Sequence, residues 1–169
     1  MLKKSFINLR TKSALKNNKA KRINTPFTES ISIGLVHQFV DNESIQEIYH
    51  FFDKLEKQGK KVEVLIIKDK TDELNIPEFL LADSQEISAF GKWNNDAITE
   101  FTKRQFDYLI HIAREESILI DNILASSKAK CRVGKYHEHK KEYYELMISP
   151  EKDSIQKLID QIYHYIQKI

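Results

Sequence analysis

The sequence contains little cysteine, glycine or proline, and each shortage excludes a class of protein. Among its 169 residues are one Cys, four Gly and three Pro. A single Cys cannot form an intramolecular disulfide, so a disulfide-stapled secreted fold is excluded and a reducing compartment, the cytoplasm, is expected. So few Gly and Pro residues also exclude collagen-like, low-complexity and turn-dense all-β chains.

Long apolar runs and phosphate-binding glycine motifs are also missing. No run approaches the ~20 apolar residues that cross a bilayer, and no secretory hydrophobic segment follows the charged start. Neither GxGxxG nor a Walker A sequence occurs, and the turn at 40–44 contains two acids and no Gly. Because such a turn would repel a pyrophosphate, we expect no dinucleotide or P-loop nucleotide cofactor.

The residues that are present indicate a globular domain. Hydrophobic residues make up 41% and charged residues 31% of the chain, a balance typical of a protein with a packed core. A chain of this length fits one domain and hardly two.

Carboxylates are absent from the start of the chain, where basic residues gather. The first acid is Glu29, whereas residues 1–22 contain eight basic side chains: Lys3, Lys4, Arg10, Lys12, Lys16, Lys19, Lys21 and Arg22. Residues 23–169 hold 19 basic and 25 acidic side chains, a net charge of −6 with His neutral. This asymmetry predicts a basic N-terminal arm, residues 1–25, that contacts a polyanion. Beyond Leu15 the arm has nothing to pack, and a single domain is expected over 26–169.

Strand-like and helix-like segments alternate along this domain. The clearest unit is a strand at 31–40, a helix with an apolar stripe at 45–55 that Asp41 or Asn42 caps and Gly59 ends, and a strand at 62–68. A helix at 95–104, a strand at 106–112 and a helix at 116–128 follow. The alternation predicts an α/β fold: a mostly parallel sheet with helices on both faces, in a Rossmann-like, flavodoxin-sized three-layer sandwich.

The remaining segments give weaker patterns. Segment 69–95 indicates a loop with a short strand at 87–90, and whether it holds a central strand stays open. Strands at 130–136 and 142–148 are separated by a linker short enough for a hairpin. The final helix is expected to begin with Ser149 as N-cap and Pro150 at its first position.

One part of this pattern resembles a known family. The segments are Phe106-Asp-Tyr-Leu-Ile-His-Ile112, a helix ending Ala125-Ser-Ser-Lys-Ala-Lys130, and Arg132-Val-Gly134. They resemble heptosyltransferase-type (GT-B) glycosyltransferases, in which a "DLVID" strand, a helix and "AKxRVG" belong to the N-terminal, acceptor-side Rossmann-like domain. Over its whole length the chain is similar to an uncharacterised family of small bacterial proteins that keep this half-domain behind a basic N-terminus. No position matches the transferases' catalytic acid and no nucleotide-sugar domain is present, so the resemblance implies the fold rather than the activity.

Candidate catalytic and metal-binding residues are few. His137 and His139, with Cys131 nearby, could supply metal ligands, but their spacing matches no structural zinc site and three lysines crowd the segment. We interpret it as a solvated hairpin tip. No nucleophile elbow occurs, and His111 within its apolar strand is expected to be buried. We assign no catalytic residue, no metal ligand and no cofactor, and we do not favour an enzyme.

Two aromatic residues complete the predicted nucleic-acid-binding set, which otherwise consists of the eight basic residues of the arm. Phe6 lies within the arm. Trp93 lies in a segment that indicates an exposed turn, so its ring would either stack on a base or sugar or pack partly against the domain.

The sequence leaves the target of the arm open. Eight cations without a carboxylate would release counterions on RNA or DNA, giving salt-dependent affinity with little sequence readout. Leu2, Phe6 and Leu9 could instead dip into an anionic membrane surface. A solubilising tail and a transit peptide are further interpretations.

The leading hypothesis is a non-enzymatic RNA-associated protein that docks on the ribosome or another ribonucleoprotein through the arm. The alternatives are a peripheral membrane protein and a glycosyltransferase-related domain that binds carbohydrate or nucleotide. Ligands of such sheets lie beyond the carboxyl ends of the strands, which here carry Asp41, Asn42, Asp69, Ala113, Arg114 and residues 135–139.

Overall fold

The computed structural model describes residues 2–169, and within them six parallel strands form one sheet. The strands are β1 (Ser32–Gln38), β2 (Lys61–Lys68), β3 (Leu80–Asp83), β4 (Tyr108–His111), β5 (Cys131–Lys135) and β6 (Leu146–Ile148). Their order is β3-β2-β1-β4-β5-β6, and every neighbouring pair is parallel. Because the order reverses between β1 and β4, this is the doubly wound order of a Rossmann-like fold. The predicted fold class is confirmed.

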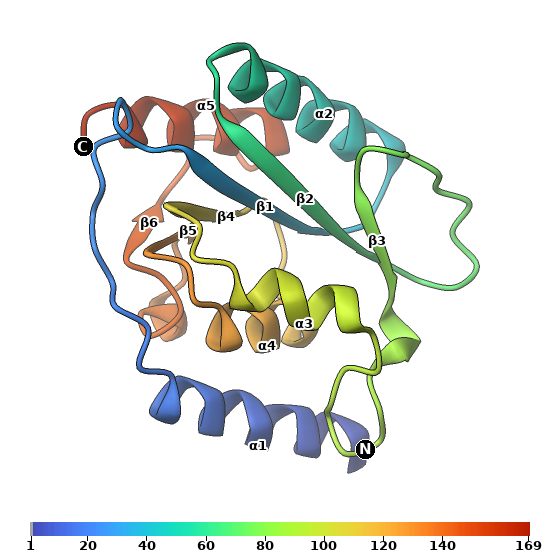
Figure 1. Cartoon of the computed structure of the whole chain (residues 1–169). Helices are drawn as coiled ribbons and strands as arrows, with labels where there is room; N and C mark the ends of the chain where they lie inside the picture. Colours follow the sequence, from blue (N-terminus) through green and yellow to red (C-terminus); the bar gives the residue numbers. More distant parts are fainter. Residues whose placement is uncertain (1) are drawn as a thin grey trace.

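Helices cover both faces of this sheet (Figure 1). The described helices are α1 (Leu2–Asn17), α2 (Asn42–Lys57), α3 (Asp96–Lys103), α4 (Ile118–Ser126) and α5 (Ile155–Ile166). α2 and α5 lie on one face, and α3 and α4 lie on the other. α1 packs against α4 and adds a further layer outside it.

The sheet separates two apolar cores. In β1, Ile33 and Leu35 belong to the core beneath α2 and α5, whereas Val36 belongs to the core beneath α3 and α4. Each central strand is therefore buried on both sides, which explains why its sequence is continuously apolar rather than alternating.

The predicted strand–helix–strand unit is present as β1, α2 and β2. Asp41 is the N-cap of α2, and its carboxylate accepts from the Ser44 N–H at 2.7 Å. The chain turns after α2 at Gly59, which has a φ of 79°. This left-handed conformation favours glycine, because glycine has no Cβ. The predicted helices at 95–104 and 116–128 are confirmed as α3 and α4, and the strand at 106–112 is confirmed as β4.

The predicted hairpin between the last two strands is wrong, because β5 and β6 are parallel. Residues 136–145 must therefore return to the starting edge of β5. Two interactions hold them there: the Tyr144 ring lies against the backbone of Gly134, and the Glu145 N–H donates to the Arg132 carbonyl at 2.9 Å. The length of the linker does not indicate the direction of β6, because that direction depends on the interactions of Tyr144 and Glu145.

Two other expectations are also wrong. Ser154, not Ser149, caps the final helix, and its hydroxyl accepts from the Lys157 N–H at 3.1 Å. Both serines suit a cap, but the buried apolar face of α5 begins only at Ile155. No strand forms at 87–90 either. Segment 69–95 instead contributes the edge strand β3, so it does not hold a central strand.

Replacing Gly134 by Ala should destabilise the connection between β5 and β6. A Cβ at this position would overlap the ring of Tyr144, whose Cζ atom lies 2.8 Å from it. Overpacking of this kind costs about 1–3 kcal/mol, so we expect the free energy of unfolding in urea to fall by that amount.

The variants Tyr144→Leu and Gly134→Ala/Tyr144→Leu test whether this steric overlap is the cause. Once the ring is absent, the substitution of Gly134 should cost clearly less than it does in the native sequence. An equal cost in both backgrounds would contradict the explanation.

Candidate functional site

Helix α1 is fixed to the domain by a buried chain of hydrogen bonds. Trp93 Nε1 donates to Asn122 Oδ1 at 3.1 Å, and Asn122 Nδ2 donates to the Thr11 hydroxyl at 3.1 Å. That hydroxyl donates to the Ile7 carbonyl within α1 at 2.8 Å. All four residues are buried, so the chain joins α1, α4 and the 88–93 loop through bonds that solvent does not compete for.

The N-terminal half of α1 also lies directly on the 88–93 loop. Gly91 has a φ of 72°, and a Cβ there would lie 3.0 Å from the N and Cα atoms of Ile7, so only glycine suits this position. Arg10 Nε donates to the Phe90 carbonyl at 2.7 Å. Phe6 meets Phe90 edge-on, with 5.7 Å between the ring centroids. These interactions fix which face of α1 points outward.

Residues 18–25, here called the strap, continue from α1 along the side of the domain towards β1 (Figure 1). Asn18 Nδ2 donates to two carbonyls of residues 125–127, both at 2.8 Å. The Arg22 guanidinium donates to carbonyls of residues 127–129. The strap thus satisfies carbonyls at the end of α4. The expectation that the chain beyond Leu15 has nothing to pack is wrong.

The six lysines among the predicted basic residues face solvent, and none of them has an acidic partner among the described residues. They are Lys3, Lys4, Lys12, Lys16, Lys19 and Lys21, all exposed. Among the described residues, no carboxylate oxygen lies within 4.0 Å of their ammonium groups. Their positive charge is therefore not neutralised from within the chain.

Arg22, by contrast, is used internally. Its Nε lies 3.6 Å from Glu145 Oε1, and the same oxygen accepts from Nη2 of the buried Arg132 at 2.7 Å. Burial and the neighbouring charge of Arg132 lower the pKa of Arg22, although Glu145 opposes the effect. We therefore assign Arg22 to anchoring the strap rather than to ligand binding.

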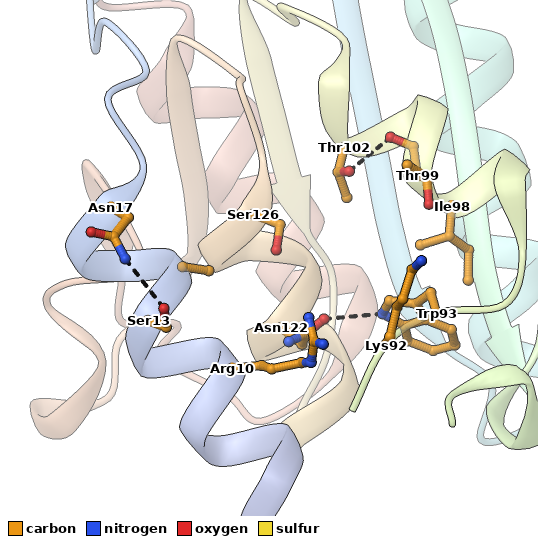
Figure 2. Close-up of a pocket in the computed structure, with 11 residues that line it drawn as sticks. Arg10, Ser13, Asn17, Lys92, Trp93, Ile98, Thr99, Thr102, Asn122 and Ser126 are labelled. Atoms are coloured by element: carbon orange, nitrogen blue, oxygen red, sulfur yellow. Dashed lines mark hydrogen bonds between the residues drawn. The ribbon is translucent and has the colours of Figure 1, made fainter. Parts of the chain in front are cut away.

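A groove of about 420 Å³ lies between α1 and α3, with α4 beneath it (Figure 2). Its polar lining consists of Arg10, Ser13, Asn17, Lys92, Thr99, Thr102, Asn122 and Ser126. The lining contains no carboxylate. It offers two cationic side chains and several hydroxyl and amide groups. These groups suit a phosphate group as ligand better than they suit a cation as ligand.

Two further hollows lie beside α1 and the strap. The hollow beside the strap, about 320 Å³, is lined by Lys19, Lys21, Lys128 and Lys130. Lys130 is paired with Asp107 at 2.7 Å. The hollow beside the C-terminal half of α1 is lined by Lys12, Leu15, Lys16 and the carboxylate-bearing Glu142.

The basic surface is therefore larger than the sequence indicated. We define it as Lys3, Lys4, Arg10, Lys12, Lys16, Lys19, Lys21, Lys92 and Lys128. Lys92 and Lys128 have no carboxylate oxygen within 4.0 Å among the described residues. No local pattern pointed to these two residues, since the fold alone brings them beside α1 and the strap.

The two aromatic candidates lie in different environments. Trp93 is only 9% exposed, so the expectation of an exposed ring is wrong and the alternative, packing against the domain, is confirmed. Although Trp93 contributes to the groove lining, it has no free ring face for stacking. Phe6 is 38% exposed and stays a candidate for ligand binding.

The carboxyl edge of the sheet holds two buried histidines, His37 at the end of β1 and His111 at the end of β4. His37 Nδ1 lies 2.5 Å from the Ile112 carbonyl, and His111 Nδ1 lies 2.7 Å from the Tyr144 hydroxyl. Burial lowers the pKa of His37, and it lowers the pKa of His111 to about 3. Both rings are therefore neutral near neutral pH.

The histidines and the cysteine considered as metal ligands do not come together. The described residues contain no group of three side chains that could hold a metal ion. Cys131 is buried in the sheet, and burial raises its pKa to about 12. His137 lies 3.3 Å from Glu116, in the crossover between β5 and β6 rather than at a hairpin tip.

Comparisons with known proteins give a family but no activity. No curated protein matches the chain. A protein-family model matches residues 3–169, which include α1, the strap and the whole sheet, and it is described as "Family of unknown function (DUF6913)".

Removing the amide of Asn122 should release α1 from the domain. Asn122→Ala leaves the Trp93 Nε1–H without its partner, and an unpaired buried donor costs about 1–3 kcal/mol. We expect faster hydrogen exchange in residues 2–17 and red-shifted emission from Trp93, the sole Trp. Asn17→Ala, which removes an exposed amide bonded to Ser13 at 3.2 Å, is the matched control. Unchanged exchange in α1 of Asn122→Ala would show that the hydrogen-bond chain does not hold the helix.

The two buried histidines should make stability fall at mildly acidic pH. Because their folded pKa values lie below the ordinary value of 6.5, the unfolded chain binds more protons below that pH. Their contribution is complete above about pH 6.5 and declines as the pH falls towards the folded values, by at most about 1.4 kcal/mol per pH unit for each histidine.

Urea unfolding at several pH values measures this dependence. His111→Asn, which can keep a hydrogen bond to Tyr144, should have a shallower slope than the native chain between pH 5 and 6.5, a range that lies above the ordinary pKa values of carboxylates and ends at that of histidine. His50→Asn, at an exposed position of α2, should keep the native slope. Parallel slopes for His111→Asn and the native chain would refute the assignment.

Proposed function

We propose that this chain, which belongs to the DUF6913 family of unknown function, binds RNA without catalysing a reaction on it and docks through its basic surface on a ribonucleoprotein such as the ribosome. The observation that carries the proposal is the set of six lysines on α1 and the strap that lack an acidic partner. The packed helix α1 and the hydrogen-bonded strap present them from an ordered backbone, so less conformational freedom is given up when a ligand binds.

The electrostatics favour a polyphosphate ligand. Each lysine that neutralises a backbone phosphate releases a condensed counterion, and this entropy gain depends on salt rather than on base sequence. The residues from 23 onward carry a net charge of −6. A polyanion is therefore repelled by most of the domain and guided towards α1 and the strap.

The groove between α1 and α3 supports RNA in particular. Its lining combines Arg10 and Lys92 with hydroxyl and amide groups and contains no carboxylate (Figure 2). The cations suit a phosphate. The neutral groups suit a ribose 2′-hydroxyl, which both donates and accepts and which DNA lacks. One nucleotide of a single strand would lie in the groove, and flanking phosphates would lie against the lysines.

Charge reversal on α1 tests the proposal. Lys12→Glu/Lys16→Glu should weaken binding to a fluorescent single-stranded RNA, measured by anisotropy, and should flatten the slope of log K against log salt by about 0.7 for each phosphate that the variant no longer neutralises. Lys152→Glu/Lys157→Glu makes the same charge change at exposed residues before and within α5, on the opposite side of the sheet. The affinity of this control for RNA should fall much less.

Two outcomes would refute RNA binding. One is an equal fall in affinity in the α1 variant and in the α5-side control, because binding would then depend on net charge and not on the basic surface. The other is that the native chain fractionates separately from ribosomes and other ribonucleoproteins in a low-salt lysate. A DNA strand of the same sequence should bind more weakly if the groove binds the 2′-hydroxyl.

A membrane surface is the second candidate, and one observation favours it. Leu2, Phe6, Leu9 and Phe90 are all exposed, with Leu9 at 64%, and they lie near the lysines of α1. None of the described helices has the length and apolar character required to span a bilayer, so any attachment through them would be to the surface. Leu9→Asp separates the two candidates. It should abolish binding to phosphatidylserine vesicles if α1 inserts its apolar residues, whereas RNA affinity should fall only slightly.

A further inference from the structure

Unpaired polar atoms gather at one place in the fold. Among the described residues, three buried side-chain atoms have no hydrogen-bond partner: His37 Nε2, Gln38 Oε1 and His111 Nε2. All three belong to the carboxyl ends of β1 and β4, the two strands between which the strand order reverses. An unpaired buried polar atom destabilises a fold. Two of the three belong to His37 and Gln38, which line a hollow, whereas His111 does not line it. These two atoms call for a ligand that supplies the missing partners.

Two of these atoms are hydrogen-bond acceptors. The Ile112 carbonyl can only accept, and it lies 2.5 Å from His37 Nδ1. Nδ1 therefore carries the proton, and Nε2 of the neutral ring is left with a free lone pair. His37 is 1% exposed. Gln38 Oε1 is an acceptor by its nature, so the missing partner must be a donor at both positions.

A hollow adjoins both residues. It has a volume of about 130 Å³, and His37, Gln38, Ala113, Ser117 and Ile155 contribute to its lining. A second hollow of about 120 Å³ shares Ile155, Ser44 and Arg114 with it. The first is too large for a single water, which occupies about 30 Å³ in the liquid, and close to the roughly 150 Å³ that holds a benzene-sized ring.

The charged residues that line the hollow are one cation, Arg114, and two carboxylates, Glu115 and Glu116. Arg114 lies 3.9 Å from Asp41, and Glu116 lies within 3.4 Å of both His137 and Lys140. Glu115 has no ion-pair partner among the described residues, so such a lining does not favour an anion. The Ser117 hydroxyl oxygen already accepts from the Ile120 N–H at 3.4 Å, so its own proton is free to donate to a ligand oxygen.

We propose that this hollow binds a small neutral polyol, a single sugar ring or a molecule of that size, whose hydroxyl groups donate to His37 Nε2 and Gln38 Oε1. Hydroxyl groups both donate and accept, so the same molecule also satisfies Ser117. The two acceptors have no exposed surface, whereas Gln38 as a residue is partly exposed. Its side chain turns when the polyol enters. This site is separate from the basic surface and does not depend on RNA binding.

Nuclear magnetic resonance of the isotope-labelled full chain tests the proposal, with D-ribose, D-glucose and myo-inositol as probes. At least one of them should cause saturable shifts of amide signals in residues 38–44 and 113–117. Gln38→Met keeps the length of the side chain and removes the acceptor, so it should weaken binding by about tenfold, the value of one hydrogen bond. Ala113→Leu should block the hollow and abolish the shifts.

Controls separate this site from folding and from the basic surface. Gln85→Met, at an exposed position, and Lys12→Glu/Lys16→Glu should both keep the native affinity. Gln38→Met should unfold in urea at the same or a higher midpoint than the native chain, because it removes an unpaired buried acceptor. Glucuronate should bind more weakly than glucose, because the carboxylates of the lining repel an anion.

Three results would overturn the proposal. The first is the absence of saturable local shifts with all three probes. The second is equal affinity in the native chain and Gln38→Met. The third is tighter binding of glucuronate than of glucose, which would mean that the hollow recognises an anion rather than a neutral polyol.

Discussion

The hydrogen bonds from Trp93 to Asn122 and from Asn122 to Thr11 decide whether this chain carries an ordered basic surface or a loose basic tail. Both bonds are 3.1 Å long and lie in a buried position. A helix with lysines along its length gains little from apolar burial, and α1 buries only Ile7 and Thr11. Satisfied polar groups in a low-dielectric environment therefore supply the specificity that apolar area does not. The close approach of Gly91 to Ile7 fixes the same orientation from the other side.

The strap extends this attachment to the sheet. Arg132 and Glu145 form a charged pair beside β5, and Arg22 joins it from the strap. The same Glu145 also holds the crossover between β5 and β6 through its backbone N–H. Glu145 therefore contributes both to the anchoring of the strap and to the course of the crossover between β5 and β6. The hollow at the carboxyl edge depends instead on β1 and β4, so the two proposed sites are separate in space and in the interactions that maintain them.

The elements that sequence reasoning identified correctly share a physical property: their signals are local. Asp41 caps α2 through a residue three positions away, and the apolar runs of β1, β2 and β4 follow from burial on both faces. The wrong expectations depended on distant partners. The direction of β6 is set by Tyr144 on Gly134, and the burial of Trp93 is set by Asn122 and α1. A segment rich in Gly and Asn gives no sign of such partners.

The amino-acid sequence by itself determined the α/β class, a mostly parallel sheet and the concentration of basic residues before residue 23, because periodicity and charge are properties of the chain. Only the tertiary structure decided which cations are free. Packing diverts Arg22 to Glu145 and adds Lys92 and Lys128 to the surface. It also brings His37 and Gln38 to the hollow between β1 and β4. Availability of a charge or a lone pair depends on its neighbours in space, and these are fixed by packing between segments far apart in the chain.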